Sequence, residues 1–392
     1  MRPDGQPVPR RFTREEYERR LALVRAAMSE RGLNVLVVVG AENVHYLSGL
    51  DAQTFFVPTA LLVTATGSPV LVARAMEGPT VTDQTVGCDF APYPDQEEPA
   101  AALPRVLRTV SGRHDRIGVP RDLMALPPNV WDALRAALPD REFSDGAGIV
   151  EAVRSIRSAA EVSCIRAAAA TSTAGMRAAI GAAADGASER EVAAEAYRAL
   201  ILAGSEYPGF VPLVRSRQRL MQEHVTWSDR RLAKQDALFL ELSGCVARYH
   251  APMARMVYIG SAPSGSERAA QIAQAGLESI RAALTAGATA SGVYQTWQQT
   301  MNSELGHDRY RRHHCGYLVG LGFPPSWVGG SRVVGLRPGN DMVLREGMTF
   351  HAFSWLLGQP PADYVLSDTM LVTPDGAEIL TDAPREPIVI EN

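Results

Sequence analysis

The residue with the clearest chemical potential is Glu241, which lies within the apolar run 237–244. A carboxylate in such a strand-like run is costly unless it is paired, hydrogen-bonded or neutralised. Burial would raise its pKa, whereas a nearby cation would lower it. The alternation Leu240-Glu241-Leu242-Ser243 also permits a glutamate on the solvent face of a half-exposed strand. The run alone therefore leaves both roles open.

Histidines and an arginine flank this run on both sides. His224 lies in a polar loop just ahead of the strand of Glu241, and histidine is the natural general base near neutral pH. A surface-loop histidine is the alternative. His250 and Arg255 follow Glu241 directly and could point at the same site, although ordinary hairpin polarity explains them equally well.

Further histidines occur towards the end of the chain. The adjacent pair His313-His314 precedes the strand-like residues 316–322. On a strand two adjacent rings point to opposite faces, so the pair is a poor two-ligand metal site and at most one ring faces the site. His351 lies in an apolar strand, which is more typical of a satisfied core histidine. The sequence has no GxGxxG, GxxxxGK, GxSxG or HExxH motif.

The elements that must position these residues follow a repeated plan. They are predicted in the order helix 159–184, helix 188–203, strands 237–244 and 251–260, helix 266–286, helix 291–305, and strands 316–322, 348–357 and 364–373. The helix entry Asp185-Gly186-Ala187-Ser188 matches Ala286-Gly287-Ala288-Thr289 at an offset of 101 residues. We therefore expect two αα-plus-strands halves, related by a pseudo-two-fold, that share a sheet around a small-molecule site.

Residues 1–150 predict a smaller α/β domain. Thr13 and Glu16 form a capping-box pattern at the start of a helix. A short valine-rich run at 34–40 predicts a buried strand, and two more strands and a helix are expected at 60–65, 69–73 and 130–137.

Length and composition exclude several classes of protein. The chain has 392 residues, which predicts two domains, and 46% of them are apolar, which excludes wholesale disorder. The formal charge of −4 is too small and too mixed for a nucleic-acid footprint. The apolar runs are too short to span a bilayer, and the charged first residues are unlike a signal peptide. Four scattered cysteines predict reduced thiols in a cytoplasmic protein.

The order of motifs resembles the creatinase/aminopeptidase P/methionine aminopeptidase superfamily, which has the pita-bread fold. Segments 43–49, 154–161 and 367–381 are similar to its N-terminal domain, its entry into the catalytic domain, and its closing strand and turn. The resemblance implies an α+β fold. A creatinase-type α/β domain is expected at residues 1–152, and a pita-bread catalytic domain with an internal pseudo-two-fold at 153–392.

Peptidases of this superfamily bind two metal ions through Asp, Asp, His, Glu and Glu. The matching positions here are Glu241, Pro252, Tyr317, Phe353 and Ser367. Proline and phenylalanine offer no side-chain donor, and tyrosine and serine are weak ligands at neutral pH. The resemblance therefore indicates the metal-free branch, with no metal and no cofactor.

Within that branch the motifs are most similar to those of ectoine hydrolase. One departure is that Trp327 is followed by Val328-Gly329-Gly330, where ectoine hydrolases tend to have an acidic residue. This departure leaves the substrate open.

The resemblance also implies roles for individual residues. Glu241 is expected to be the catalytic acid residue, as nucleophile or as base for water, with His224 as the proton shuttle. Residues expected to bind the substrate or exclude water are His250, Arg255, Tyr317, His314, Trp227, Phe323, Trp327 and His351.

The expected reaction is metal-independent hydrolysis of a C–N bond, in a cyclic amidine or an amide, within a small polar nitrogen compound. Three alternatives stay open: a cyclase, lyase or dehydratase of a specialised biosynthetic pathway, a non-catalytic binding protein on a degenerate peptidase fold, and a metallopeptidase with rearranged ligands. Relatives of this type commonly form homodimers. We therefore expect a cytoplasmic homodimer that binds a small molecule and neither nucleic acid nor membrane.

Overall fold

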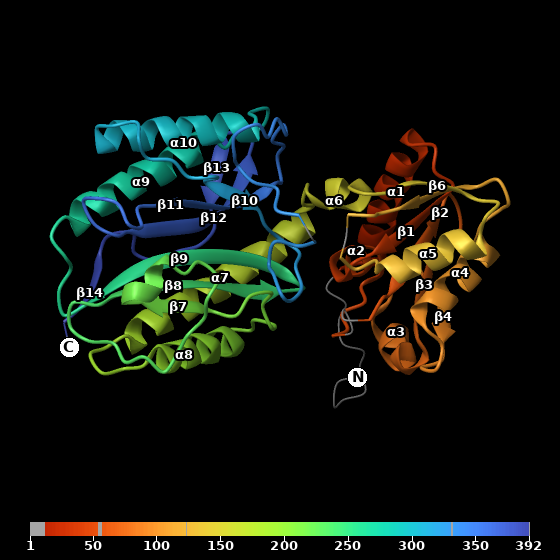
Figure 1. Ribbon diagram of the computed structural model, residues 1–392, viewed down its shortest axis with the longest axis horizontal. Coiled ribbons are helices and arrows are strands. Elements are labelled where there is room, and N and C mark those ends of the chain that lie inside the picture. The colour runs from red at the N-terminus through yellow and green to blue at the C-terminus, as the bar shows by residue number, and fades with distance from the viewer. Residues whose placement is uncertain (1–11, 54–56, 123, 331, 392) are drawn as a thin grey trace. The chain divides into compact units, whose positions relative to one another are not determined.

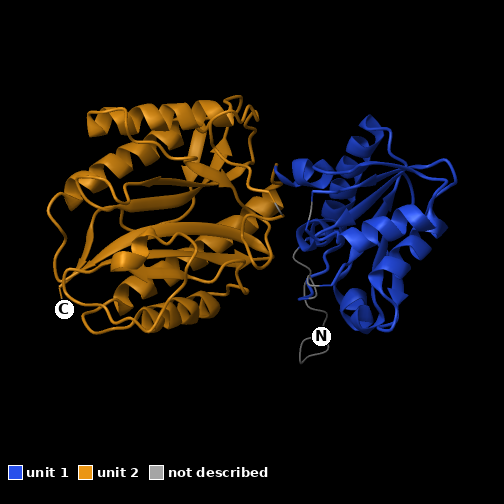
Figure 2. Cartoon of the chain, in the orientation of Figure 1, with its two compact units in different colours: residues 1–155 blue, residues 156–392 orange. Residues whose placement is uncertain are grey.

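The computed structural model describes residues 12–391 apart from 54–56, 123 and 331. The chain divides into two compact units, with the boundary between Ser155 and Ile156 (Figure 2). This boundary lies close to the one expected between residues 152 and 153. Each unit is built on a sheet of its own.

The first unit has a six-stranded sheet in the order β4-β3-β2-β1-β5-β6. Its elements are α1 (Arg14–Glu30), β1 (Val35–Val39), α2 (Ala41–Ser48), β2 (Ala60–Thr64), β3 (Val70–Arg74), η1 (Ala75–Glu77), α3 (Gly78–Gln84), β4 (Asp89–Tyr93), α4 (Pro99–Val110), β5 (Arg116–Val119), α5 (Pro128–Ala137), β6 (Glu142–Asp145) and α6 (Ile149–Arg154). Thr13 caps α1 as predicted, since its side chain accepts from the Glu16 N–H. Helix α4 was not predicted, because Pro104 inside it is a residue that normally breaks helices.

The second unit contains the larger sheet, with strands in the order β10-β11-β12-β9-β8-β7 (Figure 1). β13 pairs with β12, and β14 pairs with β9. Its elements are α7 (Ala159–Ala182), α8 (Glu189–Leu202), β7 (Leu213–Ser216), η2 (Arg217–Met221), β8 (Ala237–Val246), β9 (Tyr249–Ile259), α9 (Ser266–Ala283), α10 (Ala290–Leu305), β10 (Gly316–Leu318), β11 (Thr349–Trp355), β12 (Val365–Thr373), β13 (Gly376–Ile379) and β14 (Ile388–Ile390).

The predicted repeat is present in this unit. The Ser188 side chain caps α8 by accepting from the Glu191 N–H, and Thr289 caps α10 by accepting from the Gly292 N–H. Each capping residue also forms an isolated β-bridge, with Arg231 and Val343 respectively. The two halves therefore begin their second helix in the same way. The fold is α+β, as expected.

The helix pairs cover one face of the larger sheet. Leu240 of β8 packs in a core cluster with Met176 of α7, and Phe350 of β11 packs in another with Trp297 of α10. Side chains alternate along a strand. Glu241, which is next to Leu240, and His351, which is next to Phe350, therefore point to the opposite face.

β10 is shorter than the predicted strand 316–322. It ends at Leu318, and beyond it Leu321 forms an isolated bridge with Tyr249 of β9. Among the described helices, none combines the length and the hydropathy needed to cross a membrane.

Candidate active site

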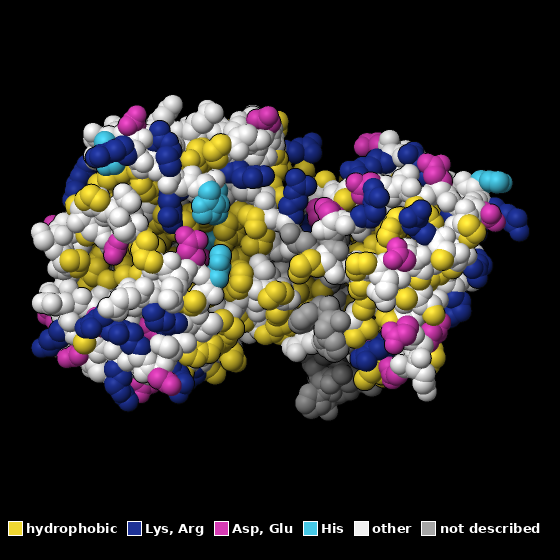
Figure 3. All heavy atoms as spheres, viewed as in Figure 1, with side chains coloured by type: hydrophobic (Ala, Val, Ile, Leu, Met, Phe, Trp, Pro, Cys, Tyr) yellow, Lys and Arg dark blue, Asp and Glu magenta, His cyan; other side chains and the backbone are white. Residues whose placement is uncertain are grey.

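The sheet register brings the superfamily's metal-ligand positions together on one face. Glu241 lies opposite Ala254, Ala254 opposite Ser367, and Ser367 opposite Phe353, so these residues form one row across β8, β9, β12 and β11. The next row on the same face ends with His351 opposite Tyr317. Figure 3 shows that histidine and acidic side chains lie beside hydrophobic ones on the drawn face of the larger unit.

Glu241 is a nearly buried carboxyl group at the β8 end of this row. Its side chain is 15% exposed. Burial raises its pKa from 4.5 to about 7, while the charge of Arg215 lowers it and that of Glu223 raises it. Because this pKa lies near neutral pH, Glu241 can exchange a proton under physiological conditions, as a general acid or base must.

A hydrogen-bonded network lies beside Glu241. His351 Nδ1 is 2.9 Å from the Tyr317 hydroxyl, and His351 Nε2 is 2.7 Å from Ser367 Oγ. Trp327 Nε1 donates to the same Tyr317 oxygen at 3.0 Å. Glu241 Oε1 lies 3.9 Å from His351 Nδ1. The network fixes the Tyr317 hydroxyl close to the carboxyl group.

The protonation states of this network follow from burial. Burial lowers the pKa of His351 to about 3, so the ring is neutral and has one donor and one acceptor nitrogen. Burial raises the pKa of Tyr317 far above its ordinary value, and the charge of Glu241 raises it further. Tyr317 therefore keeps its proton and can donate a hydrogen bond.

Aromatic rings line the part of the site where further metal ligands would be needed. Phe353 stacks on Trp355 with ring centroids 4.4 Å apart, and it meets His314 edge-on at 4.9 Å. Tyr317 lies 5.8 Å from Phe353. Burial lowers the pKa of His314 to about 3. This half of the site is therefore lined by aromatic rings and a neutral histidine, with the Arg312 guanidinium 4.2 Å from the Trp355 ring centroid.

The prediction that His313 and His314 point to opposite faces of a strand is wrong. Both residues precede β10 in a loop. Their ring centroids are 4.1 Å apart in an edge-on arrangement. Loop backbone does not impose strand alternation, which is why the rings can touch.

His224 lies at the exposed end of the site. Its ring stacks on Phe210, with centroids 6.4 Å apart, and Phe210 meets Trp327 edge-on at 4.8 Å. Trp327 in turn lies 6.4 Å from His351. A chain of ring contacts therefore connects His224 with the hydrogen-bonded network beside Glu241.

The loop that carries His224 is fastened at both ends by one buried carboxylate. Glu189 Oε1 accepts from the Ser216 N–H at 2.9 Å and from its hydroxyl at 2.8 Å. Glu189 Oε2 accepts from the Ser228 N–H at 2.9 Å and its hydroxyl at 2.6 Å, and also from Arg219. Residues 217–227 are thereby held as a closed loop.

His250 and Arg255, both expected to bind substrate, are used by the protein itself. His250 Nε2 accepts from the Gly209 N–H at 2.8 Å, and Nδ1 lies 3.2 Å from the Gly320 carbonyl oxygen. Both ring nitrogens are therefore occupied, and burial lowers the pKa of the ring to about 3.

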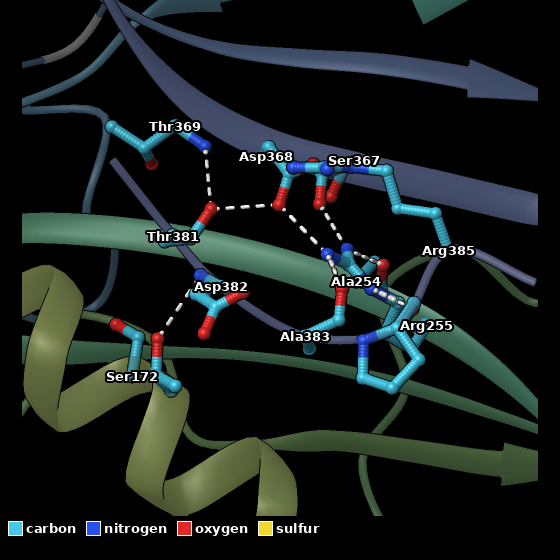
Figure 4. Close-up of polar contacts among 12 residues, drawn as sticks. Ser172, Ala254, Arg255, Ser367, Asp368, Thr369, Thr381, Asp382, Ala383 and Arg385 are labelled. Carbon is cyan, nitrogen blue, oxygen red and sulfur yellow. Dashed lines mark hydrogen bonds and ion pairs between the residues drawn. The ribbon is translucent and has the colours of Figure 1, made fainter. Parts of the chain in front are cut away.

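Arg255 lies on the face of the sheet opposite to Glu241. Its five N–H groups donate to four backbone carbonyls, those of Ala254, Ser367, Ala383 and Pro384, and to Asp368 Oδ1 at 2.9 Å (Figure 4). Asp368 also accepts from Thr381 at 2.7 Å and from Arg385 at 3.0 Å. Arg255 has no N–H left for a substrate, so its expected role is replaced by a structural one.

Trp227 and Phe323, both expected to bind the substrate or exclude water, pack against other parts of the larger unit. Trp227 meets Tyr197 of α8 edge-on at 6.0 Å. Phe323 is buried and lies beneath the Arg248 guanidinium, 4.7 Å from ring centroid to cation. The structure thus gathers Glu241, Tyr317, His314, Trp327 and His351, with His224 at the margin.

Two residues of the site were missed from the sequence, Phe210 and Arg215. Arg215 lies on β7 opposite Phe239, on the same face as Glu241. An arginine between Leu213, Val214 and Ser216 was a usable signal, since a cation in a short apolar run needs a partner. Phe210 lies in a loop and left no pattern.

The donor set does not fit a dinuclear metal centre. Of the five ligand positions, only Glu241 offers a carboxylate. Across the described part of the chain, no group of three or more histidine, cysteine, aspartate or glutamate side chains could hold a metal ion. The face around Glu241 therefore has too few donors for a pair of divalent cations.

Comparison with known proteins identifies the family. The chain belongs to metallopeptidase family M24, whose family model matches residues 163–374, and it has a Creatinase/Prolidase N-terminal domain at residues 20–156. It is 31% identical to the ectoine hydrolase of Halomonas elongata over 96% of this chain and 97% of that one. It is 27% identical to a probable dipeptidase PepE of Mycobacterium tuberculosis, over 97% and 98% of the two chains.

Solved structures agree on the fold. The dipeptidase PepE from Mycobacterium ulcerans matches with a TM-score of 0.82 and 24% identity, over 97% of this chain and 99% of that one. An Xaa-Pro dipeptidase from Bacillus anthracis matches with a TM-score of 0.83 and 19% identity, over 95% of this chain and 100% of that one.

Proposed function

We propose that this protein is a metal-independent hydrolase of a C–N bond, in an amide or cyclic amidine of a small polar nitrogen compound. The observation that supports this most directly is Glu241, a buried carboxyl group with a pKa of about 7 that stands alone at a metal-ligand position. The likeness to an ectoine hydrolase along 96% of the chain supports the same class.

Glu241 is proposed to act as the base in this reaction. Its ionised form takes a proton from water, and the water oxygen forms a bond to the carbon of the C–N group. The C–N bond then breaks as the nitrogen receives a proton, so that one water is added in total. His224, at the exposed margin, is proposed to shuttle the proton. A positioned proton-transfer group of this kind contributes roughly 10²–10⁴-fold to the rate.

The Tyr317 hydroxyl is proposed to stabilise the charge that develops on the substrate. It keeps its proton because burial raises its pKa, and its oxygen accepts from Trp327 Nε1. In the His351 tautomer whose Nδ1 carries the proton, His351 donates to the same oxygen and the hydroxyl proton of Tyr317 is left for the substrate. A donor fixed before the reaction needs no reorganisation when charge appears, which is the basis of oxyanion stabilisation. The rings of Phe353 and Trp355 supply an apolar wall that strengthens such interactions.

The experiment is a mass-spectrometric screen of purified protein against ectoine, hydroxyectoine, other cyclic amidines, N-acyl amino acids and Xaa-Pro dipeptides. A product heavier by one water, formed without added metal and in the presence of a chelator, is the expected result. Glu241→Gln should lower that turnover by at least roughly 10²-fold. The control Glu195→Gln, on α8 with a side chain that is 45% exposed, should not.

Other outcomes separate the alternatives. A product of unchanged or lower mass would indicate a cyclase, lyase or dehydratase, and binding without turnover would indicate a binding protein. Stoichiometric metal by elemental analysis, with inhibition by chelators, would show a metallopeptidase with rearranged ligands. The homodimer stays a prediction, which light scattering after size exclusion would test.

A further inference from the structure

Arg215 is a buried cation that the proposed reaction does not use. The residue is only 3% exposed. Its guanidinium lies over the Phe239 ring, 4.1 Å from the centroid, and Nη1 donates to the Gln222 carbonyl oxygen. Its Nε is buried and has no hydrogen-bond partner among the described residues. A buried guanidinium held this loosely is costly.

The nearest opposite charges do not neutralise it fully. Glu241 and Glu223 both interact with Arg215 electrostatically. Among the described residues, however, neither carboxylate has an oxygen within 4.0 Å of a guanidinium nitrogen, the distance that defines an ion pair. Arg219 adds a repelling positive charge. The guanidinium therefore has binding capacity left for an anion that comes from outside the chain.

The sheet register fixes where that anion would lie. Arg215 is opposite Phe239, and Glu241 is two residues further along β8 on the same face. Diagonal neighbours of this kind have Cβ atoms about 7 Å apart. A small molecule bound to Arg215 by one end can therefore present a group only a few bonds away to Glu241.

We propose that Arg215 is the specificity-determining residue that binds a carboxylate of the substrate, a few bonds from the C–N bond that is cleaved. This inference rests on the proposed function, because it takes the face around Glu241 as the substrate site. The planar guanidinium fork matches the geometry of a carboxylate. A dianion such as a phosphate fits poorly, because Glu241 and Glu223 repel a second negative charge.

The test compares three carboxylates with their primary carboxamides, which have nearly the same shape but lack the negative charge of the carboxylate. The probes are ectoine, N-acetyl-L-alanine and glycyl-L-proline, each titrated calorimetrically into wild type, Arg215→Met, Arg215→Lys and the control Arg311→Met. Arg311 is an exposed arginine, so Arg311→Met removes the same charge without touching the site.

We expect at least one carboxylate to bind wild type about 10- to 100-fold more tightly than its carboxamide, as charge-assisted hydrogen bonds from one guanidinium predict. Arg215→Met should abolish this preference, Arg215→Lys should keep part of it, and Arg311→Met should leave it unchanged. If wild type shows no such preference for any pair, or if Arg215→Met retains it, the proposal is wrong.

The carboxamide probes also distinguish a lost anion site from a loosened loop. Arg215 holds the loop at Gln222, so Arg215→Met could weaken binding by releasing that loop. A loosened loop would weaken carboxylate and carboxamide alike, whereas loss of an anion site weakens only the carboxylate. If the preference is found and wild type hydrolyses no compound of the mass-spectrometric screen, the proposed reaction fails while the anion site stands.

Discussion

Replacing Glu241 with glutamine should make the folded protein more stable at alkaline pH. The carboxyl has a pKa of about 7 when folded and an ordinary value of 4.5. Between these values the folded protein holds a proton that the unfolded chain has released, so the stability of wild type falls as pH rises. The difference corresponds to about 3 kcal/mol above pH 7, at 1.36 kcal/mol for each pKa unit. Glutamine has nearly the same shape and cannot ionise, so it removes this penalty.

The assay is urea denaturation of wild type, Glu241→Gln and the control Glu195→Gln at pH 5 and pH 8. The free energy of unfolding of Glu241→Gln should exceed that of wild type by about 1 kcal/mol or less at pH 5, and by about 3 kcal/mol at pH 8. Glu195→Gln should follow wild type at both values. An advantage that does not grow with pH would refute the claim that burial keeps this carboxyl protonated.

Two further predictions concern the framework around the site. Glu189→Gln should release the loop that carries His224, because a glutamine side chain cannot accept the hydrogen bonds of both serines and also neutralise an arginine. Hydrogen exchange at the Ser228 amide should then become faster, while the amides of β8 stay protected. Equal protection of the Ser228 amide in both proteins would contradict the proposed fastening. Asp368→Asn should lower the free energy of unfolding, measured by urea denaturation, by roughly 3–5 kcal/mol, because it leaves Arg255 buried without its carboxylate partner. The control Asp382→Asn, at an exposed site, should change it little. A small loss for Asp368→Asn would show that the ion pair is dispensable.

The helical framework was largely predictable because its signals are local. The caps at Ser188 and Thr289 belong to short motifs that a single sequence displays. The strand that carries Glu241 was predictable too, but the alternation of its residues also allowed a solvent-facing glutamate. The burial of Glu241 was therefore left open by the run itself.

The roles of His250 and Arg255 could not be predicted because they depend on strand register. The hairpin between β8 and β9 turns at Ala247 and Arg248, which both have positive φ angles of 51° and 66°. Such turns usually contain asparagine or glycine, so the sequence did not show where the chain reverses. The turn pairs Leu240 with Arg255 and so directs Arg255 away from the site.

Arg215 and Phe210 were missed for a different reason. β7 has only four residues and, within the described part of the chain, pairs only with β8, so its contact with Glu241 is a product of the tertiary fold. The aromatic lining around Phe353 likewise comes from segments that are separated by long stretches of sequence.

The duplication of the larger unit has a consequence for how a ligand is held. The acid and the arginine come from β8 and β7 of the first half, whereas Tyr317, His351 and the aromatic wall come from β10 and β11 of the second. Any small molecule that reaches both Glu241 and Tyr317 must bridge the seam between the halves. Such a molecule acts as a non-covalent cross-link, so saturating ligand should make the two halves unfold together at a higher temperature than without it.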